Sequence, residues 1–355
     1  MGASKGVERT VRQDVVDRLV YVTLRLFLCM LQALPLSFCV AFRKPLAWLV
    51  YDALKIRRKT IDENLAFAFP KLNQTQRQVI ARAMWRHLFL MVVEAAHVPR
   101  KIHDTNWRDY VRISDEDCYH NVAMMLDDRS CIMVSGHYGN FEVGGVVSGL
   151  LGFPTYTVAR PLDNRYLHEF VNAFRGATGQ FILPKKGSAS QIDAVLRAGG
   201  TIVLLGDQAA GPKGCWVDFF GRPASCHKAV ALFSLVNRAP MMLVYAERSG
   251  EPMQFKMGVR SIFDPNSQAM GVKELTQWYS NELEAVVRWH PEQYWWLHRR
   301  WKAKPVRKGG RRMDPSQDRA EPHAHGKSAE TTVLNQLEPH RPSQANQAPD
   351  QHPSK

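Results

Sequence analysis

The stretch CIMVSGHYGNFEVGG, residues 131–145, joins an apolar run to a glycine-rich turn that carries one histidine and one acid. Its first five residues are typical of a strand buried on both faces. The two glycines around the histidine predict a turn, and Asn140 is a favourable N-cap. Glu142 would then lie in the first turn of a helix, where the helix dipole favours a carboxylate. This stretch therefore predicts a strand, a turn and a helix start, with His137 at the carboxyl end of the strand.

The chain downstream alternates in the same way between short apolar runs and segments with helical spacing. Strands are expected at 155–159, 201–208, 241–247 and 253–259, and helices near 165–175, 191–200, 227–239 and 272–290. Upstream, the spacing is helical over most of residues 45–125. Strands that alternate with helices of this length predict an α/β domain, a mixed sheet flanked by helices, over residues 61–305. Residues 306–355 have few apolar side chains and are expected to form a disordered tail.

An apolar run at residues 19–42 is long enough to cross a bilayer as a helix. Arg25, Gln32 and Pro35 interrupt it. Arg25 is expected to snorkel to the interface, and Pro35 is able to break the helix. Residues 1–60 are thus expected to anchor the chain to the membrane, either as a full span or as an interfacial helix. Basic residues follow the run more densely than they precede it, which favours a domain on the cytoplasmic face of the inner (plasma) membrane.

The composition limits the classes of binding partner but does not identify one. The formal net charge of +14 favours anionic partners such as acidic lipids, phosphorylated groups or nucleic acid. No motif interleaves basic and aromatic residues as a nucleic-acid binder would, so nucleic acid is not expected. The six cysteines form no C-x-x-C pair and no zinc-ligand spacing with histidine, and they fit a reduced compartment. Neither a metal nor a cofactor is expected.

His137 and Glu142 lie five residues apart. On one continuous helix this spacing would place the two side chains about 140° apart, on diverging faces. A turn between them instead allows Glu142 to reach back to His137, which lies at the edge of the sheet where α/β proteins usually bind ligands. A histidine held by a carboxylate is a general-base arrangement. The spacing alone is equally compatible with a structural histidine beside a capping glutamate.

Further blocks along the chain carry a resemblance to a known family. They are TVARPLDN at 157–164, LLGDQAAGPKGCWVDFFGRPA at 204–224, PEQYWWLHRRWKAKP at 291–305 and the upstream IDENLAFAFP at 61–70. With HYGNFE at 137–142, they resemble the bacterial lipid A biosynthesis acyltransferases, within the lysophospholipid acyltransferase superfamily. The resemblance covers roughly residues 15–305 and implies a glycerol-3-phosphate acyltransferase-like fold. The C-terminal tail lies outside it.

The resemblance implies transfer of an acyl chain from a carrier thioester, acyl-acyl carrier protein or acyl-CoA, to a hydroxyl of a membrane glycolipid. His137 would be the general base, oriented by Glu142. Substrate would be bound by Arg160 and Asn164 of one block and by Asp207 and Gln208 of another. Asp207 is equally compatible with orienting glycan hydroxyls, with holding Arg160 or with capping a turn.

Several alternatives remain open from the sequence. Backbone N–H groups of the glycine turn and Arg160 are both candidates to stabilise the oxyanion. G-x-S-x-G is absent, so a covalent nucleophile is not expected, and Cys131 reads as a buried strand residue. The acceptor could also be another glycolipid, for instance a phosphatidylinositol mannoside acylated from acyl-CoA. The intact His137–Glu142 pair argues against a membrane-bound binding protein that has no catalytic activity. The block at 291–305 fits either an aromatic and basic edge near the membrane or the carrier protein, or aromatic core packing.

Overall fold

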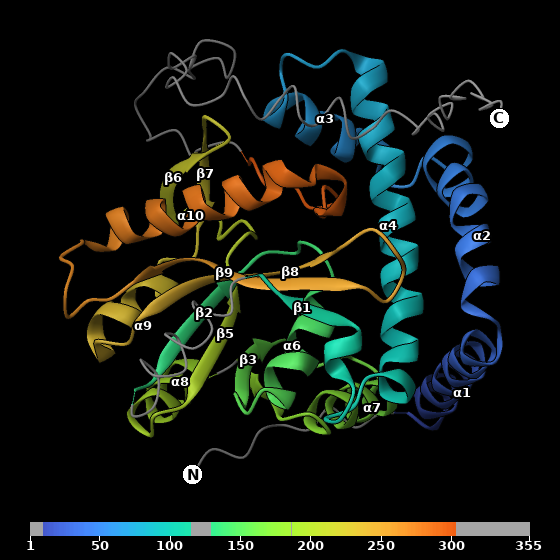
Figure 1. Cartoon of the computed structure of the whole chain (residues 1–355), viewed down its shortest axis with the longest axis horizontal. Helices are drawn as coiled ribbons and strands as arrows, with labels where there is room; N and C mark the ends of the chain where they lie inside the picture. The colour runs from blue at the N-terminus through green and yellow to red at the C-terminus, as the bar shows by residue number, and fades with distance from the viewer. Residues whose placement is uncertain (1–9, 115–128, 186, 303–355) are drawn as a thin grey trace, which may run out of the picture. The chain divides into compact units, whose positions relative to one another are not determined.

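The structure is a computed structural model that describes residues 10–114, 129–185 and 187–302 (Figure 1). Cys118 and the expected tail at 306–355 lie outside these residues. The helices are α1 (Val11–Ala33), α2 (Leu36–Trp48), α3 (Arg58–Ala68), α4 (Gln74–Lys101), α6 (Phe141–Leu150), α7 (Arg165–Gly176), α8 (Ser188–Arg197), α9 (Ala229–Asn237) and α10 (Val272–Trp289). A π-helical turn at Leu49–Ala53 and 3₁₀ turns at Trp107–Asp109 and Pro291–Gln293 complete the helical segments of the described part.

A seven-stranded mixed sheet forms the centre, in the order β1-β9-β8-β2-β5-β3-β4. Its strands are β1 (Val111–Ile113), β2 (Cys131–Ser135), β3 (Thr155–Ala159), β4 (Gln180–Pro184), β5 (Thr201–Leu205), β8 (Met241–Arg248) and β9 (Phe255–Phe263). Only the β8–β9 pair is antiparallel. In Figure 1, α10 lies above the sheet and α6, α7 and α8 lie below it. The expected α/β architecture of a mixed sheet flanked by helices is confirmed.

The register of β2 and β5 sets the position of the site. The two strands are parallel neighbours, with Ser135 paired to Leu205 at their carboxyl ends. His137 follows Ser135 by two residues, and Asp207 follows Leu205 by two. Because parallel strands end at the same edge of a sheet, these two side chains leave adjacent strands at the same level.

Two elements carry no clear pattern in the sequence. The edge strand β4 has one well-exposed apolar side chain, Phe181, so it reads neither as a buried strand nor as a clean alternation. A hairpin of β6 (Cys215–Phe219) and β7 (Arg222–Cys226) lies outside the main sheet, and α10 packs against β6. Most of the hairpin falls in the block at 204–224, where the sequence shows a family resemblance but no strand pattern.

The apolar run at residues 19–42 is not one continuous helix. It breaks at Pro35, and α1 and the helical segment after it are bent by 118°. Proline has no N–H to continue the helix, which explains the position of the break. Among the described residues, no single helix is long and apolar enough to cross a membrane, and the bent pair meets that test only when its two parts are taken together.

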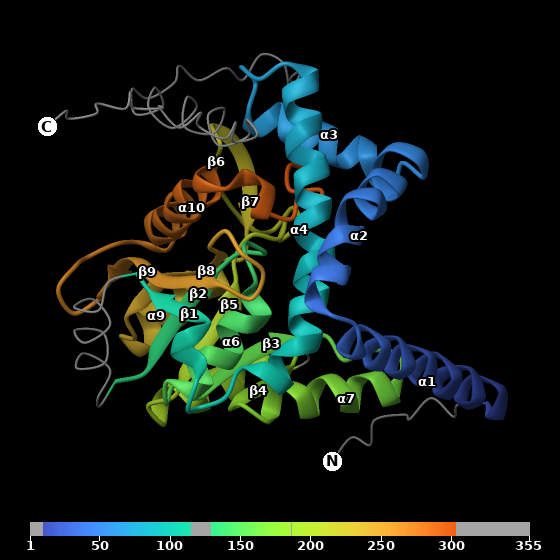
Figure 2. The ribbon, with the colours of Figure 1, turned by 45° about the vertical axis from the view of Figure 1, so that its right-hand side comes forward.

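The polar residues of this run contact the protein. The Arg25 guanidinium lies 4.7 Å from the centre of the Phe170 ring on α7, instead of extending toward an interface. Gln32 donates a hydrogen bond of 2.7 Å to the Ala96 carbonyl of α4. Figure 2 shows α1 beside α7, where Arg18 also donates to the Tyr166 hydroxyl. One face of α1 is therefore a protein-packing face.

Candidate active site

Backbone hydrogen bonds to two other segments fix the turn that carries His137. The Gly139 N–H donates to the Gln293 carbonyl, and the Asn140 N–H donates to the Ala246 carbonyl. Gly139 has a φ of +59°, and a Cβ there would collide with the Ala246 carbonyl oxygen, so only glycine fits. The Asn140 side chain accepts a hydrogen bond from the first turn of α6, which confirms it as the N-cap.

Asp207 holds His137 through two hydrogen bonds. Its Oδ1 accepts from the ring Nδ1 at 2.9 Å, and its Oδ2 accepts from the His137 backbone N–H at 2.9 Å. Both residues are buried, at 7% and 3% exposure. Burial alone would raise the pKa of the Asp207 carboxyl, but the interactions with His137 outweigh burial and lower that pKa. Because the carboxylate keeps the proton on Nδ1, the Nε2 lone pair is available to accept another proton.

Aromatic rings surround the His137 imidazole. The ring centres of Phe141, Trp295 and His298 lie 5.3, 5.0 and 5.2 Å from that of His137. The Trp295 backbone N–H also donates to the His137 carbonyl at 3.0 Å. On the open side, the exposed Gln208 places its amide nitrogen 3.5 Å from Nε2 of His137. The C-terminal block thus packs around the histidine, and Gln208 lies where a hydroxyl would donate its proton.

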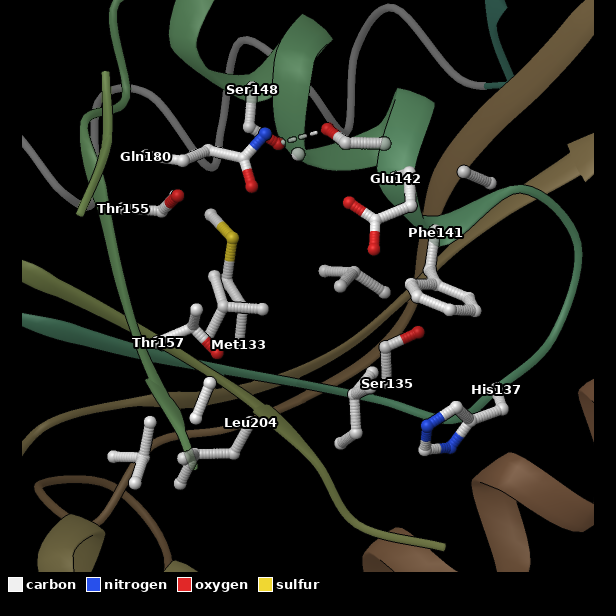
Figure 3. Close-up of a pocket in the computed structure, with 18 of the residues that line it drawn as sticks. Met133, Ser135, His137, Phe141, Glu142, Ser148, Thr155, Thr157, Gln180 and Leu204 are labelled. Carbon is white, nitrogen blue, oxygen red and sulfur yellow. Dashed lines mark hydrogen bonds between the residues drawn. The ribbon is translucent and has the colours of Figure 1, made fainter. Parts of the chain in front are cut away.

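Glu142 does not contact His137, which differs from the arrangement expected from their spacing. Its carboxylate pairs with Arg175 of α7, with Oε1 at 2.5 Å from Nη2 and Oε2 at 3.1 Å from Nε. Within the described part of the chain, no hydrogen bond joins Glu142 to His137. In Figure 3 the Phe141 ring is drawn between the two side chains. Asp207, which follows the neighbouring strand β5, makes the hydrogen bonds to His137 that the sequence spacing predicts for Glu142.

A cavity of about 670 Å³ opens beside His137, between the sheet and the helices beneath it. Its lining is mainly apolar and comes from all seven strands of the sheet and from α6, α7, α8 and α9. The lining includes Met133, Val203, Leu205, Val244, Met257, Val259, Ile192, Val230 and Phe233. Ser135, Glu142 and His137 also border it, and Figure 3 shows the Glu142 carboxylate pointing into the space. Gly144, Gly145 and Ser148 on α6 also line the cavity, and a Cβ at Gly145 would collide with the Gln180 amide.

The two expected substrate-binding residues of the block at 157–164 have different surroundings. Arg160 lines the cavity, and its exposed guanidinium contacts Asp163 at 2.9 Å. Asn164 instead caps α7, accepting two backbone N–H groups, and donates to the Asp17 carbonyl of α1. Its side chain therefore makes structural contacts, and it is absent from the described lining of the cavity.

Ser135 and Cys131 differ in access to the site. Ser135 lines the cavity, whereas Cys131 lies within the sheet beside Met133 and Met242. Burial raises the pKa of the Cys131 thiol to about 12. The thiolate, which is the nucleophilic form, is therefore disfavoured at neutral pH.

A buried ionic network behind the turn had no signal in the sequence. Glu94 of α4 pairs with Arg248 at 2.6 Å and also accepts from the Asn140 side chain. His87, two turns earlier on the same face of α4, accepts from Arg248 and contacts the Gly139 carbonyl at 3.1 Å. Burial, with Arg248 adding to it, lowers the pKa of His87 well below its ordinary value, so this imidazole is neutral. The network ties α4 to Gly139 and Asn140, at the end of the turn that leads into α6.

Known proteins with related sequences match most of this chain. The model of a family described as bacterial lipid A biosynthesis acyltransferase matches residues 12–303. The lipid A biosynthesis palmitoleoyltransferase of Escherichia coli (strain K12) is 25% identical over 260 residues, which cover 71% of this chain and 81% of that protein. The lipid A biosynthesis acyltransferase of Shigella flexneri gives the same figures. The lauroyltransferase of E. coli (strain K12) is 22% identical over the same coverage.

The matched region runs from the first turn of α1 to the C-terminal block that packs around His137. The resemblance found in the sequence is thereby confirmed. Because the family model matches well over half of its length, the chain belongs to the bacterial lipid A biosynthesis acyltransferase family and is an O-acyltransferase.

Proposed function

We propose that this chain transfers a fatty acyl chain from a carrier thioester to a hydroxyl group of a lipid A precursor. The observation that carries the proposal is the His137–Asp207 pair beside a mainly apolar cavity of about 670 Å³. Cavities of roughly 300–1,000 Å³ hold small-molecule ligands in proteins, so the space is of the right order for an acyl chain. Family membership supports the same reaction class.

In the proposed reaction His137 acts as the general base. Its Nε2 takes the proton of the acceptor hydroxyl as the hydroxyl oxygen attacks the thioester carbon and forms the new C–O bond. The tetrahedral intermediate then collapses and the C–S bond breaks. The imidazolium returns the proton to the leaving thiolate, giving the free carrier thiol. Asp207 fixes the tautomer and stabilises the imidazolium, and Gln208 leaves Nε2 when the hydroxyl binds.

The oxyanion of the intermediate needs hydrogen-bond donors, and the turn around His137 offers few free N–H groups. The backbone N–H groups of His137, Gly139 and Asn140 already donate to protein acceptors. Arg160 remains as a cation on the lining of the cavity. Its contact with Asp163 is largely exposed and so costs little to break. We therefore assign Arg160 to the thioester carbonyl or to a phosphate of the substrate.

Acyl carrier protein is the donor that the charges favour. Carrier proteins are acidic, whereas this chain has a net charge of +14 and its cavity lining includes Arg160 and Lys185. Opposite charges speed association and orient the partners. In a comparison of matched acyl-acyl carrier protein and acyl-CoA donors, we expect a higher kcat/KM for the carrier protein, with an advantage that falls as salt rises.

The proposed function is tested with the purified full-length chain in detergent or vesicles. The chain is incubated with acyl-acyl carrier protein and a lipid A precursor that has a free hydroxyl, and products are read by mass spectrometry. The expected product is heavier than the acceptor by one acyl group minus water. If phosphatidylinositol mannoside is acylated and the lipid A precursor is not, the acceptor assigned here is wrong.

We also propose that α1 and α2 attach the chain to the inner membrane, with the catalytic domain on the cytoplasmic side. Apolar side chains along both helices are exposed, among them Leu19, Leu26, Phe38, Phe42 and Trp48. Exposed basic residues follow them at Lys55, Arg57 and Lys59. Apolar side chains flanked by cations are the usual signature of binding at an anionic lipid surface.

Flotation with vesicles tests this attachment. The chain is expected to float with vesicles rich in phosphatidylglycerol and less with neutral ones. Phe42→Asp, at an exposed position of α2, should lower the bound fraction several-fold, since it places a charge in the interface. Val236→Asp on α9 is the matched control because Val236 is 72% exposed and lies on a different helix. Equal losses for the two variants would contradict a role for α2.

A further inference from the structure

The residues that follow four neighbouring strands form a row along the carboxyl edge of the sheet. His137 follows β2, Gln208 follows β5, Arg160 follows β3 and Lys185 follows β4, and all four line the cavity. The strands lie in the same order, β2-β5-β3-β4, and each pairs with the next in parallel (Figure 2). Because parallel strands end at one edge of a sheet, the row begins at the base His137 and ends at the cation Lys185.

The row is about as long as the pantetheine arm that carries an acyl group. The four strands end level, since Ser135 pairs with Leu205 and the register continues through β3 to Pro184. Three strand spacings of about 4.8 Å separate β2 from β4, so the two ends of the row are about 14 Å apart. In phosphopantetheine about 13 bonds join the sulfur to the phosphorus, and they reach about 15 Å when extended. A thioester at His137 therefore places the phosphate near Lys185.

The Lys185 end of the row carries positive charge without an acid to balance it. Glu142 is the only carboxylate on the lining that the structure describes, and it pairs with Arg175. The Lys185 ammonium and the His227 imidazole both line the cavity, and neither has an ion pair or hydrogen bond among the described residues. Partial burial and the charges of Lys185 and Arg300 lower the pKa of His227, so both cations are near its ring. This end of the cavity is therefore suited to an anion.

We propose that Lys185 and His227 bind the phosphate of the phosphopantetheine arm of the acyl donor, while the thioester lies at His137. This inference rests on the proposed acyl transfer and names the part of the donor that the chain recognises. The Lys185 ammonium pairs with one phosphate oxygen, and the His227 imidazole donates a hydrogen bond to another. Acyl carrier protein and coenzyme A both contain this arm, so the site serves either donor.

The acyl donor fits this row better than a phosphate of the acceptor does. One donor molecule holds, at fixed distances, the three parts that the cavity matches: an alkyl chain for the apolar walls, a thioester for His137 and a phosphate for Lys185. Gln208 and Arg160 follow the two strands between these ends, and their side chains are donors suited to the amide carbonyls of the arm. In the proposed reaction the acceptor needs only to bring its hydroxyl to His137.

The test measures binding of two inert donor analogues to the full-length chain by calorimetry. The analogues are S-alkyl pantetheine and S-alkyl 4′-phosphopantetheine of one chain length, thioethers that cannot transfer the chain. The phosphate is expected to lower Kd about tenfold at low salt, as a charge-assisted contact at a partly exposed site would. Lys185→Met combined with His227→Ala should bring the ratio of the two Kd values to about one, whereas Lys185→Arg should keep most of it. Because the readout is a ratio, a general loss of binding cancels from it.

Lys273→Met, at an exposed position of α10 outside the described lining, removes the same charge and should leave the ratio unchanged. A second arm uses acyl-acyl carrier protein and compares the KM of a phosphorylated lipid A precursor with that of its dephosphorylated form. If the double variant changes only the acceptor preference, the site binds the acceptor and the inference is overturned. Equal Kd values for the two analogues with the native chain also overturn it. Since the binding measurement needs no turnover, failure of the proposed function appears separately, as absence of transfer in the second arm.

Discussion

Replacing His137 by alanine is expected to lower the acyl-transfer rate by about a thousandfold or more. The variant removes the only Nε2 that lies beside both the cavity and the buried carboxylate of Asp207 in the described structure. General-base assistance typically contributes about 10²–10⁴ in rate, and the retained binding of both substrates would leave a small residual activity. The rate is measured by mass spectrometry of the acylated acceptor under single-turnover conditions, so that product release does not hide the chemical step.

The fold is expected to survive this change. The turn around His137 is held by backbone hydrogen bonds of Gly139 and Asn140, which the substitution leaves in place. Vesicle binding should therefore remain near that of the native chain, while the thermal unfolding midpoint falls by a few degrees because the buried Asp207 carboxylate loses the hydrogen bond from the imidazole. His103→Ala, at an exposed histidine, is the matched control and should keep the native rate. A His137→Ala variant that transfers acyl groups at the native rate would rule out the proposed base.

The sequence predicts the central strands well because burial leaves a local pattern. The run at 131–135 is buried at every position in the structure, and the runs at 155–159 and 201–205 pair with it or beside it as parallel strands. Edge strand β4 gives no strand signal in the sequence, because apolar and polar residues do not alternate along it and its outer face is partly exposed. The break at Pro35 was foreseen as a possibility, since proline acts locally on the helix.

The carboxylate that contacts His137 cannot be predicted from a local sequence pattern. Asp207 lies 70 residues further along the chain, and its contact with His137 depends on β5 being the neighbour of β2. Strand order is a property of the whole sheet, and no local pattern encodes it. Glu142 is the partner that nearness in sequence predicts, but its side chain contacts Arg175 of α7, and no local pattern indicates that contact. The Glu94–Arg248 pair likewise joins elements that lie far apart in the sequence.

Two carboxylates are thus candidates to assist His137, and substitution distinguishes them. Asp207→Asn is expected to lower the transfer rate by about 10²–10⁴, because an amide neither fixes the Nδ1–H tautomer nor stabilises the imidazolium. Glu142→Gln should have a smaller effect, within about tenfold, because it weakens the partly exposed pair with Arg175 and leaves the Asp207 hydrogen bonds intact. Both variants are isosteric, so each is compared with the native chain under the same single-turnover assay.

The pH dependence of the rate adds a readout that a structural defect would not give. If Asp207 stabilises the imidazolium, Asp207→Asn makes protonation of His137 less favourable, and the rising limb of the pH–rate profile should move to lower pH as its plateau falls. Glu142→Gln should lower the profile without moving that limb, since no hydrogen bond between Glu142 and His137 is present in the described structure. If Glu142→Gln lowers the transfer rate more than Asp207→Asn does and also shifts the rising limb of the pH–rate profile, then Glu142 and not Asp207 orients His137.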